Sequence, residues 1–564
     1  MAAPATTVKR LTAGFAAIAL VFGAIEAWAS RFDMYSDGIS YLDMADAMLR
    51  RDWQAAFNAY WSPLYPALLA AALSIFKPSA YWEFPVVHLV NFLAYAIALG
   101  CFHYFLKGVL SQNPQHRAPS AWLWLALGYA LFVWSSLRLI DISTVSPDML
   151  VAAAVYLAAG ALVRIIAGNH SFGIFALLGI ALGFGFLAKA PVLALSVVFL
   201  ALAFFEARRR AGVVSRVLLS VLMIAVIVGP YIARLSAASG KITTGESWRL
   251  NAAWYIDHIP RYHWQPNNPA IGTPIHSTRL LVNDPPLFEF DREGRGTYPI
   301  WFDPAYWFAG IQPHFSIKPM AQQTMAALLD YYDVFFRMEG PVLAICLALF
   351  LVSRKQLALS CDALRNWPLL LIVAAALGMY AVVHVEDRMI GAFVVILWMT
   401  LFAALPIGKE TWLFFGRYAI GALVAVLVIT LGFSMAGRLA SHSLRELLSW
   451  YRPASFYQWQ VAQELTRGGL RAGDKVAWLR PDPFTAKRNY WWARLAQLHI
   501  IAEIPAGQED RFWSADTAKR AAVVKALEGT PAKALIATRI PPGFPLEGWT
   551  PLGQTGYYLY RLAR

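Results

Sequence analysis

Long apolar runs alternate with short polar stretches along most of the chain, and this pattern predicts membrane-spanning helices. A helix needs about 20 apolar residues to cross a hydrocarbon core about 30 Å thick, so the shorter runs are marginal. One further run, 62–76, has 15 residues and begins with two prolines, which is typical of a re-entrant or interfacial helix. The candidate spans are 11–30, 83–106, 120–140, 146–167, 172–188, 190–206, 213–236, 339–353, 367–385, 389–406 and 412–435.

Basic residues between the apolar runs predict the orientation, because cytoplasmic loops carry an excess of Lys and Arg. With a cytoplasmic N-terminus and a non-spanning 62–76, the Arg208–Arg210 triplet faces the cytoplasm. If 62–76 spanned, this triplet would face outward. We therefore predict 11 spans, with 31–82, 237–338 and 436–564 outside. A bacterial-type inner membrane is the expected location, with the N-terminus cytoplasmic and the C-terminal part periplasmic.

The composition agrees with a polytopic membrane protein. Of 564 residues, 58% are hydrophobic and 15% are charged, whereas soluble domains have about 25% charged residues. Much of the net charge of +14 lies in short loops between apolar runs, which argues against a nucleic-acid-binding protein. The cysteines, Cys101, Cys346 and Cys361, have unrelated spacings. They predict neither a disulfide framework nor a zinc site.

The non-membrane parts have distinct patterns. The 237–338 segment is rich in Pro, Gly and aromatic residues and predicts a long ordered loop, which ends in a surface helix over 321–338. From about 450, short apolar strands alternate with helical stretches, which indicates a small α/β domain. It lacks a glycine-rich phosphate loop, so we assign it no nucleotide. The predicted division is therefore 1–440 for the membrane domain and 441–564 for a soluble extracytoplasmic domain.

Ionisable residues gather at the predicted outer ends of the helices. Charges in or beside a membrane cost free energy, so each is a candidate for function. Simpler roles exist: Lys189 can reach lipid head groups, Asp148 can stabilise a helix start, and Glu386 with Arg388 can form a structural ion pair. Chance would scatter such groups over both faces, whereas four segments bring them to one. The residues are Asp33, Asp37, Arg138, Asp141, Asp148, Lys189, His384, Glu386 and Arg388.

These stretches resemble the GT-C superfamily of integral-membrane glycosyltransferases, such as the aminoarabinose transferases of lipid A and the protein O-mannosyltransferases. The stretch "DGISYLDMA", 37–45, is similar to the family's "DExRYxxIA" and aligns Asp37 with its catalytic acid and Tyr41 with its tyrosine. Gly38 replaces the family's second acid, and Trp61 with Ser62 replaces a basic residue and proline that relatives often have. Further matches, in an order typical of the family over about 10–440, are "SPLYP" at 62–66, Pro147-Asp148, "AKAP" at 188–191 and "EDRM" at 386–389.

The resemblance implies a transferase that moves a monosaccharide from a polyprenyl-phosphate donor to an envelope acceptor, with inversion at the anomeric carbon. Asp37 would be the general base, with Asp33 as the second choice. Lys189 and Arg388 would stabilise the departing phosphate, with His384 as a further donor. The expected supporting polar residues are Tyr41, Asp148, Arg138 and Glu386.

The 237–338 segment offers a candidate acceptor wall, since aromatic faces beside polar groups suit sugar stacking. The simpler explanation for any one of these aromatic residues is an interfacial aromatic belt. No metal-ligand spacing is present, so we assign no metal site, although a divalent ion stays open. The proposed acceptor residues are Arg249, Trp254, Trp301 and Asp303.

Two other classes compete with a monosaccharide transferase. A transporter or flippase would have charged or broken-helix sites near the bilayer midplane, often in repeated halves, and no repeat is visible. A polysaccharide ligase or polymerase would bind a pyrophosphate with arginines of the outer loop. The candidate arginines for this binding are Arg249, Arg261, Arg279, Arg292 and Arg295. The pattern favours the monosaccharide transferase and leaves the sugar, its linkage and the acceptor open, whether glycan, lipid or protein.

Overall fold

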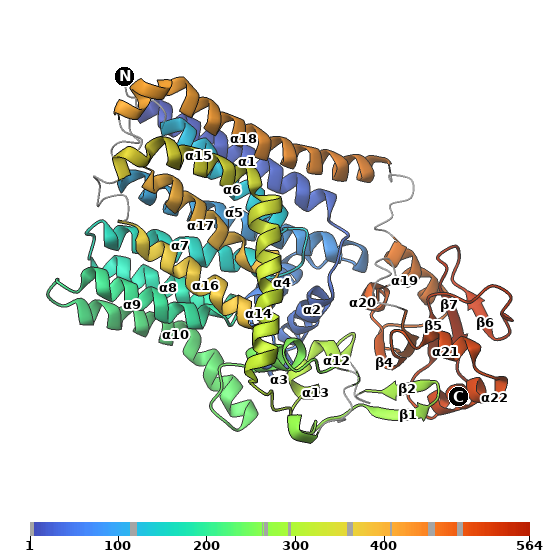
Figure 1. The fold of residues 1–564 in the computed structure, drawn as a ribbon. Coiled ribbons are helices and arrows are strands. Elements are labelled where there is room, and N and C mark those ends of the chain that lie inside the picture. Colours follow the sequence, from blue (N-terminus) through green and yellow to red (C-terminus); the bar gives the residue numbers. More distant parts are fainter. Residues whose placement is uncertain are drawn as a thin grey trace.

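A computed structural model describes residues 5–112, 121–261, 263, 269–290, 295–357, 365–405, 409–448, 457–481 and 489–563. Most of the chain forms a slab of side-by-side helices, with a small sheet domain beside one end (Figure 1). The bundle helices are α1 (Ala5–Ala29), α5 (Ala80–Gln112), α6 (Ala121–Trp134) with the π-helical turn η2 (Ser135–Leu139), α7 (Asp148–Ile166), α8 (Phe172–Ala188), α9 (Val192–Ala207), α10 (Val213–Ser239), α15 (Gly340–Leu357), α16 (Trp367–Val383), α17 (Asp387–Ala404) and α18 (Lys409–Leu448).

The predicted polytopic helical fold is confirmed, with a difference in the number of full-length spans. By length and composition, 7 of the described helices can cross a membrane, or 8 if the bent segment 317–351 counts as one span. The remaining predicted spans are the shorter helices α8, α9 and α16, of 17, 16 and 17 residues. Helices α8 and α9 lie alongside α7 and α10 in the slab, and α16 lies against α9 and α17 (Figure 1). The ambiguous run 62–76 forms the 13-residue helix α4 (Leu64–Phe76).

Short helices connect the spans at the end of the slab beside the sheet domain, which we call the site face. They include α14, which begins four residues earlier than the sequence predicts and crosses the bundle helices (Figure 1). The segment 317–338 is bent by 73° from 340–351. The other elements are α2 (Ser36–Leu49), α3 (Trp53–Ala56), α11 (Ser247–Tyr255), η3 (Pro269–Ile271), α12 (Pro299–Phe302), α13 (Pro304–Trp307), α14 (Ile317–Tyr332) and η4 (Asp333–Met338).

The sheet has seven strands in the order β1-β2-β4-β3-β5-β7-β6, with β3 parallel to β4 and β5. Its apolar core lies between these central strands and the helices α21 and α22. The predicted alternation of strands and helices after residue 450 is therefore present. The elements are β1 (Arg279–Asn283), β2 (Pro286–Glu289), α19 (Tyr457–Arg467), β3 (Lys475–Leu479), α20 (Trp491–Leu495), β4 (His499–Ile504), α21 (Glu509–Ser514), α22 (Thr517–Glu528), β5 (Ala534–Ala537), β6 (Trp549–Pro551) and β7 (Tyr558–Arg561).

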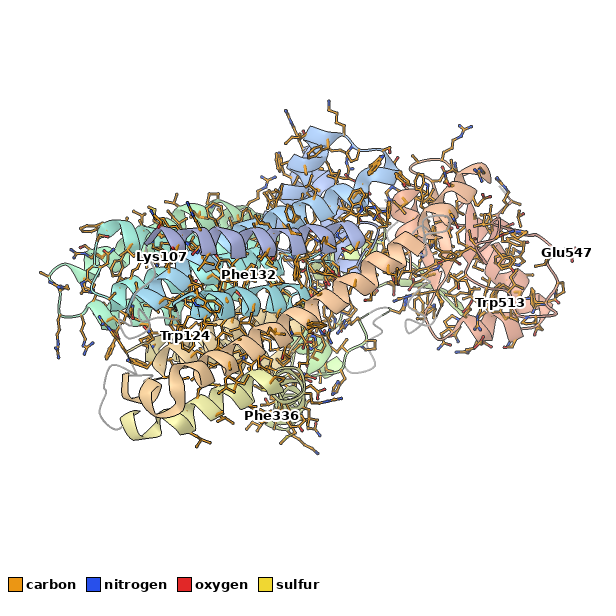
Figure 2. All side chains as sticks on the ribbon, turned by 90° about the horizontal axis from the view of Figure 1, so that it is seen from above. Lys107, Trp124, Phe132, Phe336, Trp513 and Glu547 are labelled. Atoms are coloured by element: carbon orange, nitrogen blue, oxygen red, sulfur yellow. The ribbon has the colours of Figure 1, made fainter. Side chains whose placement is uncertain are left out.

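Two strands of this sheet come from the long loop, which the sequence does not predict. β1 and β2 form an antiparallel hairpin, and β2 pairs with β4 through Phe288 opposite Glu503 and Glu289 opposite Ala502. The membrane part and the C-terminal part therefore share one sheet. Lys107 marks the opposite end of the bundle from Trp513 and Glu547 of the sheet domain (Figure 2).

Helix ends bring ionisable residues to the site face. Pro147 precedes α7, so the fixed φ of proline starts the helix and Asp148 lies in its first turn, where the helix dipole favours an acid. α8 ends because Lys189 is extended, with φ −157° and ψ 129°. α16 ends in the same way at His384, with φ −166° and ψ 137°. Each break therefore lies beside a charged or titratable side chain.

Candidate active site

A cavity of about 430 Å³ opens at the site face between the bundle and the long loop. This is the size of a small-molecule site. One part of the lining is apolar and comes from α8, α9 and α16, with Phe186, Leu193 and Val383 among its residues. The rest is polar or aromatic. The sequence-predicted residues that line it are Asp37, Tyr41, Lys189, Trp254, Trp301, His384, Glu386 and Arg388.

Arg388 forms the centre of the charged cluster. Its Nε lies 2.5 Å from Glu386 Oε2, its Nη2 lies 3.4 Å from Asp37 Oδ2, and its Nη1 lies 3.6 Å from Asp148 Oδ2. The Lys189 ammonium donates to Asp148 Oδ1 at 2.6 Å. Asp148 is buried behind the lining, since its side chain is only 2% exposed. Two cations thus hold three carboxylates from four separate chain segments.

Asp37 lies in the first turn of α2 and is the carboxylate best placed to meet a substrate. Its Oδ1 accepts from the Trp301 indole N–H at 3.3 Å, while Oδ2 faces Arg388. Burial raises the pKa of the Asp37 carboxyl above its ordinary value, although the Arg388 and Lys189 charges and the Trp301 hydrogen bond oppose the shift. A buried carboxylate with a raised pKa and an open cavity in front of it has the properties of a general base.

His384 and Glu386 form a second part of the cluster. His384 Nε2 lies 3.0 Å from Glu386 Oε1, and its ring stacks on Tyr255 with centroids 3.8 Å apart. Burial alone would raise the pKa of Glu386, but hydrogen bonds from His384 and Arg388 and the Arg388 charge hold it below its ordinary value. Glu386 therefore carries a fixed negative charge that keeps Arg388 and His384 in position.

Arg261 adds a cation that the site prediction did not include. It lines the cavity, and its guanidinium lies 4.6 Å from the centre of the Tyr255 ring. Among the residues that the structure describes, no carboxylate lies within 4.0 Å of it. Lys189 and Arg388 are both neutralised by carboxylates, so Arg261 adds positive potential to the cavity.

Five predicted site residues do not line the cavity, and one of them, Asp148, is buried behind it. Asp33 is exposed, and its backbone carbonyl accepts from His88 Nε2 at 2.9 Å. Arg138 is exposed on η2, away from the cavity. Arg249 pairs with Glu246 at 3.1 Å. Asp303 caps α13 by accepting from the Tyr306 N–H at 3.2 Å, and burial raises its pKa to about 6.

Several lining residues were missed by the sequence analysis. Trp61 replaces a residue of the family pattern, and its indole N–H donates to the Trp301 carbonyl at 3.3 Å. The Tyr60 hydroxyl donates to Asn251 Oδ1 at 3.2 Å and so joins the α3–α4 connection to α11. No local pattern distinguishes the others. The missed residues are Tyr35, Tyr60, Trp61, Ser62, Tyr255 and Tyr380.

Metal ligands are not grouped in the part of the chain that the structure describes. No three His, Cys, Asp or Glu side chains within those ranges lie close enough together to hold an ion.

A bundle of membrane helices, with surface helices and a small sheet domain over a cavity of acids and bases, is the architecture of the GT-C fold, and the chain adopts this fold. ArnT from Cupriavidus metallidurans is similar in its apo state, with a TM-score of 0.51 and 12% identity over 99% of this chain and 98% of ArnT. ArnT bound to undecaprenyl phosphate gives a TM-score of 0.52 and 11% identity over 100% and 99% of the two chains.

A third solved structure is the oligosaccharyltransferase of Archaeoglobus fulgidus in complex with zinc and sulfate. It has a TM-score of 0.50 and 11% identity over 93% of this chain and 68% of that chain. No family model and no curated protein sequence matches the chain. At these identities the likeness establishes the fold, and the reaction has to be argued from the site.

Proposed function

We propose that the protein transfers a monosaccharide from a polyprenyl-phosphate donor to an envelope acceptor at the outer face of a bacterial-type inner membrane. The observation that carries this proposal is the cavity in which Asp37 faces Arg388, with Lys189 also in its lining and Asp148 buried behind it. A base, two cations and an apolar wall lie together at the end of a membrane bundle. Such a site suits a reaction between a lipid-borne leaving group and a polar acceptor.

The donor would use both parts of the cavity. Its polyprenyl chain would lie along the apolar lining from α8, α9 and α16, which includes Phe186 and Val383. Its phosphate would approach Lys189 and Arg388, with His384 as a further hydrogen-bond donor and Arg261 as an additional cation. The ArnT structure with undecaprenyl phosphate is consistent with this arrangement, since that protein shares the fold.

The reaction would be a single displacement. The acceptor hydroxyl attacks the anomeric carbon while Asp37 takes its proton, and such general-base catalysis contributes about 10²–10⁴-fold. The bond from the anomeric carbon to the phosphate oxygen breaks, and that oxygen leaves with the electron pair. Lys189 and Arg388 stabilise the negative charge that develops there, because preorganised cations act strongly where water is excluded. Attack opposite the leaving group inverts the anomeric centre.

The acceptor would enter from the long loop. Trp254 and Trp301 are stacked with ring centroids 6.0 Å apart, and Asn251 offers an amide beside them. Of the predicted acceptor residues, Arg249 and Asp303 have local structural partners instead, so we now favour the two tryptophans and Asn251 for sugar contact.

The ligase or polymerase alternative has weaker support. Of its five arginines, Arg261 lines this cavity, whereas Arg249 pairs with Glu246 and Arg279 pairs with Glu289. Arg295 lies at a different cavity, and Arg292 is outside the described residues. A transporter is also less favoured, because the breaks at Lys189 and His384 lie at helix ends on one face.

Mass spectrometry of envelope lipids and glycans tests the function in cells that lack the protein. We expect a polyprenyl-phosphate monosaccharide to accumulate, and one sugar to be missing from an envelope molecule, which then identifies the acceptor. Re-expression of the wild-type protein should restore both. Accumulation of a pyrophosphate-linked oligosaccharide would favour the ligase instead. An unchanged envelope under conditions where the protein is normally made would contradict the transferase.

The pH dependence of transfer should report the environment of Asp37. Because burial raises the pKa of Asp37, kcat should fall on the acid side with a midpoint above the ordinary Asp value of about 3.9. Glu386 has a lowered pKa, so it stays ionised over this range. In the variant Glu386→Gln a nearby negative charge is lost, and the midpoint should move to lower pH. A wild-type midpoint at or below the ordinary value would contradict the assignment of the base.

A further inference from the structure

A buried arginine of the C-terminal sheet domain contacts α2, the helix that carries Asp37. Arg494, on α20, has a side chain that is 9% exposed. Its Nη1 lies 3.1 Å from Asp43 Oδ1 and 2.5 Å from Asp46 Oδ2, both on α2. Its Nη2 and Nε bind the carboxylate of Glu83 on α5, at 2.5 and 3.0 Å. We call this set the Arg494 clamp.

The environment of Asp43 differs from what its sequence position suggests. An acid on a surface helix is expected to face water, yet Asp43 is buried. Besides Arg494, it accepts from the Thr297 backbone N–H at 2.7 Å and from the Thr297 hydroxyl at 2.8 Å. Burial of a carboxylate is tolerated only when it is paired and hydrogen-bonded. Both partners come from segments more than 250 positions away in the chain.

The sheet also holds the loop that precedes α12. The Thr297 carbonyl accepts from the Ile500 N–H at 2.9 Å, and the Gly296 carbonyl accepts from His499 Nδ1 at 2.6 Å. The Tyr298 hydroxyl lies 3.1 Å from both oxygens of Glu503, which is fully buried on β4. Residues 296–298 are therefore held by hydrogen bonds to His499, Ile500 and Glu503 of β4.

Trp301 follows this fixed segment and contacts α2 again. Its indole N–H donates to Asp37, while its carbonyl accepts from the Ser40 hydroxyl at 3.1 Å. Thus α2 is joined to the sheet domain at two levels. The Arg494 clamp and Thr297 hold Asp43, and the 296–301 segment carries Trp301 against Asp37. These two paths start on α20 and β4, which are neighbours in the domain.

We propose that the C-terminal sheet domain is a positioning element of the active site, with Arg494 as its principal positioning residue. The Arg494 clamp fixes the placement of α2, and β4 fixes the placement of Trp301, so that the Asp37 carboxylate keeps its orientation toward the cavity. The role of Asp37 as a base rests on the proposed function, whereas the mechanical coupling between the domain and α2 does not. Displacement of a catalytic group by about 1 Å can cost about 10²-fold in rate.

Hydrogen-exchange mass spectrometry of the full-length protein in lipid nanodiscs tests the coupling without any assay of activity. In Arg494→Gln, we expect deuterium uptake to rise roughly tenfold in rate for peptides covering 36–49 and 296–303, with α7 unchanged. The matched control is Arg539→Gln, which breaks ion pairs with Glu509 and Asp510 inside the same domain. It should leave both peptides as in the wild type.

A milder variant guards against loss of folding. Asp43→Asn leaves Arg494 with Asp46 and Glu83, and its amide oxygen still accepts from Thr297, so a smaller rise in the same two peptides is expected. Unchanged uptake over 36–49 in both variants would overturn the proposal. A uniform rise over the whole bundle would also overturn it, because it would indicate a general role in folding.

Transfer kinetics then separate the two proposals. Positioning predicts that Arg494→Gln lowers kcat by roughly tenfold or more while KM for the lipid donor is unchanged, since the donor-phosphate residues are not touched. An unchanged kcat would overturn the positioning role. If the two peptides respond as expected but the wild-type protein transfers no sugar from any polyprenyl-phosphate donor, the coupling stands and the proposed function fails.

Discussion

Asp37→Asn should lower kcat for sugar transfer by about 10²–10⁴-fold, the usual contribution of a general base, and leave the folded protein intact. The amide cannot accept the acceptor's proton, but it keeps the shape of the carboxyl and a hydrogen-bond acceptor for Trp301. Arg388 retains Glu386 and Asp148 as partners. Burial raises the pKa of Asp37 because desolvation of the charged carboxylate costs free energy. The neutral amide of the variant does not have this cost. Single-turnover transfer and thermal unfolding of the purified protein measure the two effects.

Asp33→Asn is the matched control for this prediction. It changes an aspartate four residues away that is exposed and does not line the cavity. Its kcat should stay within about threefold of the wild-type value, since an exposed carboxylate outside the cavity cannot reach the acceptor hydroxyl. Near wild-type activity of Asp37→Asn, together with a large loss in Asp33→Asn, would reverse the assignment of the base.

Arg388→Gln should affect both stability and activity. The Arg388 side chain is 13% exposed and faces Asp37, Asp148 and Glu386. Without it, Asp37 loses its ion pair and keeps only the hydrogen bond from Trp301 among the contacts described above, while Asp148 keeps Lys189 and Glu386 keeps His384. Removing one partner of a buried ion pair typically costs about 3–5 kcal/mol, and the variant also loses the cation that we propose stabilises the departing phosphate. We expect a lower free energy of unfolding in denaturant titration and weaker binding of polyprenyl phosphate.

A surface arginine provides the comparison for Arg388. Arg467 pairs with Glu464 on α19, three residues apart, and its side chain is 70% exposed. Exposed pairs contribute little to stability because water and salt screen them, so Arg467→Gln should unfold and bind lipid like the wild type. Equal behaviour of Arg388→Gln and Arg467→Gln would show that the charged cluster has no structural or binding role.

Helix periodicity and the cost of charge in a membrane explain what the sequence predicts well. The apolar runs coincide with helices. Lys189 ends α8 and Arg388 begins α17, and the two residues lie close together because both helix ends are at the site face. The same reasoning does not predict how a helix is rotated about its axis, and so which residues at its end face the cavity. Arg138 lies at an end of the same bundle but is exposed on the π-helical turn η2. Asp33 lies before α2 begins, so it does not share the face of Asp37.

Long-range contacts are what the sequence does not predict. Arg249 and Asp303 form hydrogen bonds with residues three positions away in the sequence. Asn251 and Trp301 instead form hydrogen bonds with residues of the α2–α4 region. Nothing in the local pattern distinguishes these two pairs. Asp43 is similar, because the partners that make its burial favourable, Thr297 and Arg494, are distant in sequence. Polar residues in loops are thus assigned less reliably than those at the ends of apolar helices.

The shared sheet has a consequence for the order of events during synthesis. Glu289 of β2 pairs with Ala502 of β4, so the ribosome must add more than 200 residues after the hairpin before its partner exists. At about 5–20 residues per second, this interval is on the order of 10–40 s. During it, α15 to α18 enter the membrane while the hairpin keeps an open edge. The sheet, and with it the contact of Arg494 with α2, therefore stays incomplete until the chain has been made as far as β4.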